Sequence, residues 1–163
     1  MNTEPKYSYS SKSLEDTKKL GLAIAENIQT PMLIELSGDL GGGKTALVKA
    51  IAKGLGINQT VTSPTFNIHR SYESPDGIVL EHFDFYRLTG GAPEFQEAGF
   101  REYFNPQSVC VVEWPDKAAG LPPADLKIEL AVDAVGSGRN VAIFAESEAG
   151  VTCLRKLQSL VVP

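Results

Sequence analysis

The sequence predicts an α/β domain in which a mixed central sheet is flanked by helices. Two segments predict the parallel centre of this sheet. The apolar run Met32–Leu36 precedes a glycine-rich turn and an amphipathic helical pattern, and Ser108–Glu113 places four apolar residues in succession before an acid. Two hairpin patterns, at Asp76-Gly77 and at Gly136–Gly138, predict antiparallel strands that extend the sheet.

Length, charge and cysteine content narrow the class of protein. The 163 residues, 42% of them hydrophobic, are enough to bury one core, so we expect a single domain over residues 1–163. The net charge of −5 excludes an overall positive field that would attract nucleic acid or a membrane surface. The sequence shows no signal peptide, no membrane-spanning stretch and no zinc-site spacing of its cysteines and histidines. We therefore expect a cytoplasmic protein without membrane contact.

The N-terminal part predicts a short strand at Tyr7–Ser10 and then a helix. Ser13 and Asp16 have the spacing of a capping box, with Asp in place of Glu or Gln, and Thr30-Pro31 ends the helix. The spacing of its apolar residues predicts an inner face made of Leu14, Thr17, Leu20 or Gly21, Ile24 and Ile28.

The segment after Met32–Leu36 reads Gly38-Asp-Leu-Gly-Gly-Gly-Lys44-Thr45 and matches the P-loop pattern G-x-x-x-x-G-K-[ST]. Glycines let several backbone N–H groups turn toward one phosphate, and the following helix adds its unpaired N–H groups and positive dipole end. We expect Lys44 to reach the β- and γ-phosphates and the hydroxyl of Thr45 to bind Mg²⁺. The pattern therefore predicts a nucleotide-binding site, and a structural glycine-rich turn is the alternative.

The remaining elements follow from local patterns. Thr60–Phe66 is polar, contains a proline and has no periodicity, so it predicts a loop. The strand over Ile78–Tyr86 has His82, Asp84 and Tyr86 on one face and Val79, Phe83 and Phe85 on the other. The other predicted elements are a strand over Phe66–Glu73 with Phe66, Ile68 and Tyr72 on one face, a helix over Glu94–Glu97, a helical turn over Arg101–Phe104, a hairpin of Leu126–Val132 with Val141–Phe144, and a tail helix over Gly150–Leu160.

Hydrolysis of a bound nucleotide needs a second magnesium ligand and a way to place water, and two acids are candidates. Glu113 directly follows the buried strand pattern, where the carboxyl end of a parallel strand faces the ligand crevice. Asp84 lies near the end of the other strand. A helix cap or a solvated edge charge is the alternative role for such an acid.

Other side chains have a functional and a structural interpretation, and position alone does not decide between them. Ser63 and Thr65 lie where related NTPases have a γ-phosphate-sensing switch, but Ser63-Pro64 also fits an ordinary turn. His82 either orients Asp84 or simply packs, and Trp114 is either a core anchor or a ring beside the site. The cations that could reach phosphate besides Lys44 are Arg70, Arg87, Arg101 and Arg139, each of which is otherwise surface charge.

Five motifs in order resemble the TsaE family, the small bacterial P-loop ATPases of tRNA threonylcarbamoyladenosine biosynthesis. They are the P-loop Gly38–Thr45, Thr62-Ser-Pro-Thr-Phe66, His82-Phe-Asp-Phe-Tyr-Arg-Leu88, Gly99-Phe-Arg-Glu-Tyr-Phe104 and Glu113-Trp-Pro115. The resemblance spans roughly Ser13 to Phe144. The P-loop is generic, whereas the set of Ser-Pro-Thr, His-x-Asp-x-Tyr-Arg and Glu-Trp-Pro is specific to the family.

The resemblance implies a P-loop NTPase-like domain that binds ATP or ADP with Mg²⁺ and hydrolyses ATP. It assigns Mg²⁺ to Thr45 and Glu113, a Walker-B-like place to Asp84 and the switch-loop place to Thr65. It also implies action with the TsaD–TsaB heterodimer, in which hydrolysis resets the complex between cycles and tRNA is reached through the complex. The residues expected at the nucleotide are Ser13, Leu14, Gly38, Asp39, Leu40, Gly41, Gly42, Gly43, Lys44, Thr45, Ala46, Trp114 and Arg139, with Ser13, Leu14 and Arg139 bordering the adenine.

The sequence departs from the family pattern at few positions. Gly42 stands where the family more often has alanine, and Glu94–Glu97 is less acidic than usual, so a partner contact there is in doubt. The tail after Ala145 matches no motif.

Three other functions compete with a partner-dependent ATPase. A small-molecule or nucleoside kinase should have an arginine-rich lid, and the sequence has no clustered arginines. A regulatory GTPase should have an Asn-Lys-x-Asp motif, which is missing. A nucleotide-stabilised binding module without turnover would not need both Asp84 and Glu113.

Overall fold

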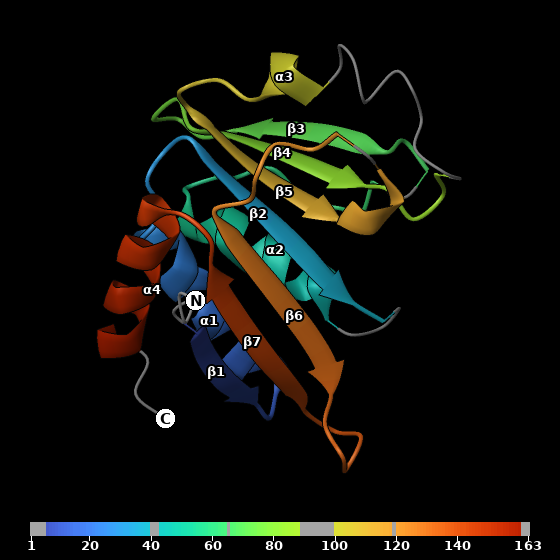
Figure 1. The fold of residues 1–163 in the computed structure, drawn as a ribbon, viewed down its shortest axis with the longest axis vertical. Coiled ribbons are helices and arrows are strands. Elements are labelled where there is room, and N and C mark those ends of the chain that lie inside the picture. Colours follow the sequence, from blue (N-terminus) through green and yellow to red (C-terminus); the bar gives the residue numbers. More distant parts are fainter. Residues whose placement is uncertain (1–5, 40–42, 65, 89–99, 119, 161–163) are drawn as a thin grey trace.

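A seven-stranded mixed sheet runs through the molecule in the order β1-β7-β6-β2-β5-β4-β3 (Figure 1). The structure, a computed structural model, describes residues 6–39, 43–64, 66–88, 100–118 and 120–160. The strands are β1 (Lys6–Ser11), β2 (Met32–Gly38), β3 (His69–Glu73), β4 (Val79–Asp84), β5 (Ser108–Glu113), β6 (Leu126–Val132) and β7 (Arg139–Ala145). The helices are α1 (Leu14–Glu26), α2 (Lys44–Gly54), α3 (Phe100–Tyr103), the 3₁₀ turn η2 (Pro115–Lys117) and α4 (Glu148–Leu160).

The centre of the sheet is parallel and its margins are antiparallel, which confirms the predicted mixed sheet. Strand β2 lies between β5 and β6 and is parallel to both, and β4 is parallel to β5. The hairpins β3–β4 and β6–β7 are antiparallel, and β1 pairs with β7. Every residue of β5 is buried, as expected for a strand covered on both faces.

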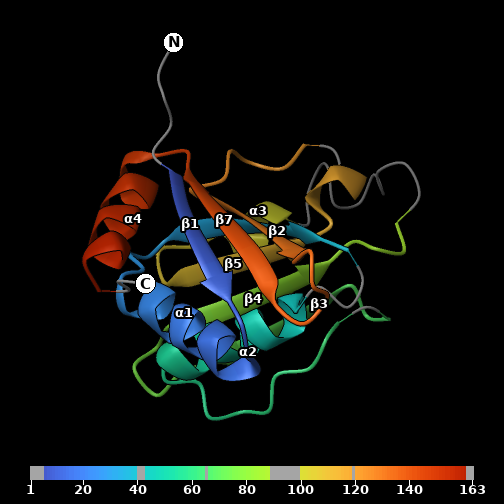
Figure 2. The same cartoon turned by 90° about the horizontal axis from the view of Figure 1, so that it is seen from below.

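Two apolar clusters cover opposite faces of the sheet. The larger cluster joins Ile34 and Leu36 of β2 to Leu20 of α1 and to Leu47 of α2. The smaller one is formed by Leu33, Phe83, Phe85, Leu88, Cys110, Val112, Ala118 and Ala124. Figure 2 shows α1 and α2 side by side along one face of the sheet.

The cysteines are free and buried, and burial raises the pKa of Cys110 to about 12 and that of Cys153 to about 11. Cys110 is therefore a core residue, as the apolar run around it predicts.

Small residues let α1 and α2 approach closely. A Cβ added to Gly21 would lie 2.4 Å from the Cβ of Ala50 and 3.1 Å from the carbonyl oxygen of Leu47. Likewise, a Cβ on Gly54 would lie 2.5 Å from the Cβ of Ala25. Because these separations are shorter than carbon–carbon contact, the two helices can pack at this distance only if glycine occupies both positions.

The helix cap and strand boundaries largely follow the sequence. Ser13 caps α1, and its hydroxyl accepts a hydrogen bond from the N–H of Asp16 at 3.1 Å. The carboxylate of Asp16 accepts from the N–H of Lys12 at 2.9 Å, so the acid reaches back one residue beyond the cap. The predicted helix over Glu94–Glu97 lies outside the described residues.

Two predicted inward-facing residues are exposed instead. Leu14 is 60% exposed because it begins α1 and lies at the end of the helix pair, beyond the Gly21–Ala50 contact that sets the packing. Phe66 is 79% exposed because it belongs to a turn, in which the N–H of Ile68 donates to the carbonyl of Pro64 at 2.6 Å. Strand β3 begins only at His69, so Phe66 is not part of the alternation.

Within the described residues, none of the helices combines the length and the apolar character needed to cross a membrane.

We expect Gly21→Ala to destabilise the protein despite its higher helix propensity. The extra methyl group would overpack the α1–α2 contact at a cost of about 1–3 kcal/mol, against a propensity gain of about 1 kcal/mol. Urea unfolding should therefore show a lower midpoint for Gly21→Ala and an unchanged one for Lys19→Ala on the exposed face of α1. A Gly21→Ala protein as stable as the wild type would contradict the close approach of the helices.

Candidate nucleotide-binding site

The P-loop connects the end of β2 to the start of α2. Gly38 has φ of +151°, and a Cβ there would lie 2.5 Å from the carbonyl oxygen of Leu130 on the neighbouring strand β6. Gly43 caps α2 with φ of +95° and offers no side-chain hydrogen bond to the first helical N–H groups. Those N–H groups are thus left to bind an anion at the helix N-terminus. The predicted nucleotide contacts at Leu40, Gly41 and Gly42 lie outside the described residues.

The P-loop lysine is buried at the start of α2. Lys44 is only 6% exposed, and its ammonium group donates to the carbonyl oxygen of Gly38 and, at 3.4 Å, to that of Asp39. The Nζ atom also lies 4.5 Å from the ring centroid of Trp114. This cation–π contact places the lysine against the segment that follows β5. The indole belongs partly to the smaller apolar cluster, so Trp114 both packs and borders the lysine.

The two predicted acids meet at the same edge of the sheet. Asp84 pairs with Glu113 in the β4–β5 register, and Leu36 of β2 pairs with Glu113 on the other side. Both carboxyl groups are buried. One oxygen of Asp84 accepts from the N–H of Tyr86 at 3.0 Å, and the other accepts from the hydroxyl of Ser63 at 3.4 Å. The carboxyl ends of the parallel strands therefore place Glu113 next to the P-loop strand and Asp84 one strand further along the same edge.

A buried histidine holds Glu113. The Nε2 atom of His82 lies 2.6 Å from Oε2 of Glu113, and the His82 side chain is fully buried. Its Nδ1 has no hydrogen-bond partner among the described residues. The alternation of β4 puts His82 on the same face as Asp84, but the structure pairs the imidazole with Glu113 of the neighbouring strand. Sequence reasoning missed this pair because the neighbour of β4 cannot be read from β4 itself.

A small cavity lies beside the P-loop, between the start of α1 and the β6–β7 hairpin. Its volume is about 160 Å³. The residues that line it are Ser11, Ser13, Leu14, Thr17, Gly43, Ala46, Ser137, Gly138 and Arg139. The structure thus brings together Ser13, Leu14, Ala46 and Arg139, four of the residues that the family resemblance assigns to the nucleotide.

The hairpin that carries Arg139 is fixed by one aspartate. The N–H of Gly136 donates to the carboxylate of Asp133 at 2.8 Å, and hydrogen bonds from backbone N–H groups, first that of Gly138, lower the pKa of Asp133. The guanidinium Nη1 of Arg139 donates to the carbonyl of Gly138 at 3.0 Å. Arg139 lies near Gly43, because a Cβ on this glycine would be 3.8 Å from its Nε atom.

The other candidate cations and the switch loop are placed differently. The guanidinium of Arg87 lies 4.1 Å from the ring centroid of Phe66, and Arg70 is exposed on β3. The side chain of Arg101 and the whole of Thr65 lie outside the described residues, so the predicted switch role of Thr65 stays a prediction. Ser63, the other switch candidate, contacts Asp84.

A second histidine–carboxylate pair, in which the carboxylate is buried and the histidine half-buried, was not predicted from the sequence. His69 contacts Glu81 at 2.5 Å, and Ser71 donates to the other oxygen of the same carboxylate. The imidazole also packs against the rings of Phe83 and Tyr103, at 4.6 and 4.3 Å between centroids. This group links β3 to β4, and β3 is the edge strand that β4 and β5 separate from the P-loop strand β2.

The donor chemistry of the site fits Mg²⁺. Thr45 begins α2 next to Lys44, and the oxygens of Glu113 and Asp84 are the acidic groups at this edge. Within the described ranges, no cluster of three or more His, Cys, Asp or Glu side chains could hold a metal by itself. Magnesium accepts such a site, because it keeps several waters and takes its remaining ligands from one or two protein oxygens and substrate phosphates.

Comparison with known proteins identifies relatives of this chain. The sequence profile of the family described as "Threonylcarbamoyl adenosine biosynthesis protein TsaE" matches residues 11–141. A tRNA threonylcarbamoyladenosine biosynthesis protein TsaE from Haemophilus influenzae is 37% identical over 120 residues, which cover 73% of each chain. The TsaE of Treponema pallidum is 36% identical over 128 residues, covering 78% of this chain and 93% of that relative. The TsaE of Bacillus subtilis is 43% identical over 101 residues, covering 61% of each chain.

A solved structure supports the same assignment. The crystal structure of Bacillus subtilis YdiB superposes with a TM-score of 0.81 and 28% identity over 98% of both chains. The fold is thus the P-loop NTPase-like fold predicted from the motif between β2 and α2. On the family match and these relatives, the chain belongs to the TsaE family of threonylcarbamoyladenosine biosynthesis proteins.

Proposed function

We propose that this chain binds ATP with Mg²⁺ and hydrolyses it as the switch subunit of tRNA N6-threonylcarbamoyladenosine synthesis, acting with the TsaD–TsaB heterodimer. The observation that carries the proposal is the position of Lys44. Its ammonium group contacts the carbonyl oxygen of Gly38 at the end of β2 and lies 4.5 Å from the ring centroid of Trp114, the residue that follows Glu113. A buried lysine at a helix N-terminus, at the sheet edge where two strands end in acids, is suited to bind a polyphosphate and the metal that accompanies it.

Different residues of the chain are proposed to bind the phosphates, the metal and the attacking water. The Lys44 ammonium can exchange its carbonyl contacts for phosphate oxygens, since both contacts are within the loop itself. Thr45 and Glu113 would hold Mg²⁺, which neutralises charge on the phosphates when bound. Asp84, which accepts a hydrogen bond from Ser63, would orient water or a metal-bound water, and Thr65 would sense the γ-phosphate.

The cavity beside Gly43 is the proposed adenine end of the site. Ser13 and Leu14 border it from α1, Ala46 from α2 and Arg139 from β7. Because these residues come from three elements, binding there would connect the start of α1 to the hairpin and the P-loop. Trp114 would pack near the phosphate end, where it already contacts Lys44.

The partner part of the proposal rests on family membership. The names of the relatives assign them to tRNA threonylcarbamoyladenosine biosynthesis, so a role in the same pathway is proposed for this chain. The net charge of −5 disfavours extensive direct contact with tRNA, and we propose that tRNA is reached through the TsaD–TsaB complex in the cytoplasm.

Lys44→Ala should weaken ATP binding. Loss of charge-assisted hydrogen bonds to phosphate costs about 1.5–3 kcal/mol, equivalent to roughly 10- to 150-fold in Kd. Titration calorimetry with Mg-ATP measures the change, and Lys19→Ala is the matched control because Lys19 is exposed on α1 and does not line the cavity beside the P-loop. Unchanged affinity in Lys44→Ala would contradict the phosphate role of this residue.

Glu113→Gln should bind ATP but lose magnesium-dependent turnover by roughly 100-fold, equivalent to about 2.7 kcal/mol of transition-state stabilisation. The amide keeps the size of the side chain and a hydrogen-bond acceptor but removes the charge. Steady-state phosphate release against Mg²⁺ concentration is the measurement, with Glu129→Gln on the exposed face of β6 as the control. Turnover at the wild-type rate would show that Glu113 is not the metal ligand.

Addition of the TsaD–TsaB heterodimer should raise ATP hydrolysis at least roughly tenfold over the slow rate of the chain alone, as partners do for other P-loop switches. The same assay in matched salt, with heterodimer, chain and both together, checks this. A rate that equals the sum of the separate components would argue against the switch function while leaving nucleotide binding intact.

A further inference from the structure

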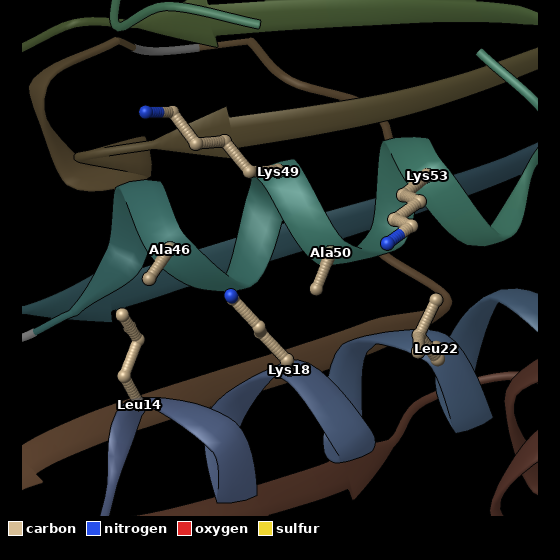
Figure 3. Close-up of a pocket in the computed structure, with 7 residues that line it drawn as sticks. All are labelled: Leu14, Lys18, Leu22, Ala46, Lys49, Ala50 and Lys53. Atoms are coloured by element: carbon tan, nitrogen blue, oxygen red, sulfur yellow. The ribbon is translucent and has the colours of Figure 1, made fainter. Parts of the chain in front are cut away.

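A groove runs between α1 and α2 on the surface opposite their contact with the sheet. It has a volume of about 450 Å³ and is lined by Leu14, Lys18, Leu22, Ala46, Lys49, Ala50 and Lys53 (Figure 3). Leu14, Lys18 and Leu22 recur at every fourth residue of α1, and the α2 residues recur with similar helical spacing. Each side of the groove therefore extends over about two helical turns, or about 12 Å.

The floor of the groove is apolar. Leu14 is 60% exposed although it belongs to the apolar stripe of α1, and Leu22 is half-buried. Ala46 and Ala50 contribute only methyl groups from the side of α2. The close Gly21–Ala50 contact fixes the two walls relative to one another, which makes the groove a rigid feature of the helix pair.

The rim of the groove is positive in a chain whose net charge is negative. Lys18 and Lys53 point toward the space between the helices, whereas Lys49 points away from α1 (Figure 3). Lys18 lies 3.5 Å from Glu15 in an exposed pair, which leaves its charge mostly available. Among the described residues, no ion pair is recorded for Lys49 or Lys53. The three lysines belong to a chain with 15 basic and 20 acidic residues, so the groove reverses the average sign of the surface.

We infer that this groove binds an acidic amphipathic helix of the TsaD–TsaB heterodimer; the inference rests on the proposed function. A third helix fits the space between two side-by-side helices, because its side chains at positions i, i+4 and i+7 can contact both walls. Apolar residues of that helix would cover Leu14 and Leu22, and its Asp or Glu side chains would pair with Lys18 and Lys53.

Nucleic acid is the less suitable occupant. A phosphate backbone would pair with the lysines but gain nothing from an apolar floor, and it usually requires a longer basic track than two helical turns. An acidic amphipathic helix can bury the apolar floor and pair with the lysines of the rim at the same time. An apolar centre with a polar margin is typical of protein interfaces.

The groove is also connected to the nucleotide end of the molecule. Leu14 and Ala46 line both the groove and the small cavity next to Gly43 and Arg139. A helix seated in the groove would therefore contact the same two side chains as the proposed adenine. This shared wall gives the partner a direct physical route to sense whether nucleotide is bound.

The test compares two charge-reversed double variants that change net charge equally. Lys18→Glu with Lys53→Glu alters the groove, and Lys19→Glu with Arg155→Glu alters exposed cations on α1 and α4 outside it. Binding of each to the TsaD–TsaB heterodimer is measured by calorimetry, and unchanged Mg-ATP affinity and circular dichroism establish that the folds are intact. We expect the groove variant to bind the heterodimer at least about tenfold more weakly and the control variant within about twofold of the wild type.

The outcomes separate the two proposals. Equal binding of wild type and groove variant would overturn the groove assignment and leave the proposed function standing. Failure of the wild type to bind the heterodimer at all would overturn the proposed partner, and the groove assignment with it. A filter-binding assay of the free chain with tRNA covers the remaining case. Loss of tRNA binding in the groove variant, with heterodimer binding unchanged, would assign the groove to nucleic acid and overturn the inference.

Discussion

Parallel pairing of β5 with β2 on one side and β4 on the other is the constraint on which the rest of the structure depends. Strands that run in the same direction end at the same edge of the sheet. The P-loop after β2 therefore lies at the same edge as the acids that end β4 and β5. Burial on both faces fixes the register, because a shift by one residue would turn apolar side chains away from the two apolar clusters. The site is thus a consequence of the way the core packs.

The same constraint explains the helix layer. Helix α2 must begin at the edge where β2 ends and must bury Leu47 and Ile51 on the sheet, which leaves its flank at Ala50 to contact α1. The contact with α1 needs Gly21 and Gly54, whose missing side chains allow the backbones to approach. A groove between the two helices then follows, because helices with small residues at their contact leave the longer side chains on either side of it.

Local patterns in the sequence were sufficient for most elements and for the edge of the sheet that carries the site. The run Val109–Val112 predicted a doubly buried strand, and the acid after it predicted the position of Glu113, because burial and strand direction are encoded within six residues. Leu14 and Phe66 were predicted wrongly for the opposite reason. For Leu14, periodicity assigned the face but did not show where the neighbouring helix stops covering it. For Phe66, periodicity did not show that the strand begins only at His69.

Contacts between distant segments could not be predicted in the same way. The pairing of His82 with Glu113 depends on which strand lies beside β4, and the approach of Arg139 to Gly43 depends on the β6–β7 hairpin turning toward the P-loop. From the residues alone Arg139 was one of four candidate arginines, and only the family resemblance distinguished it from the other three. The groove likewise depends on how two helices pack together, and the net charge of −5 gives no indication that lysines gather along its rim.

The two histidine–carboxylate pairs, which join β4 to β3 and to β5, differ in a way that bears on their roles. Glu81 has both oxygens bonded, one to His69 and one to Ser71, so its hydrogen-bonding capacity is used within the fold. Glu113 has His82 as its one recorded side-chain partner among the described residues, and that bond involves only Oε2.

Burial of the Glu113–His82 pair costs desolvation free energy, and proteins with apolar residues in place of such a pair are often equally or more stable. Stability alone is therefore a weak reason to retain the pair. A carboxylate held by one oxygen and open at the other is instead suited to a ligand role, because the histidine fixes its orientation while leaving a lone pair available. The contrast between Glu81 and Glu113 therefore supports a structural role for the first and the proposed metal-binding role for the second.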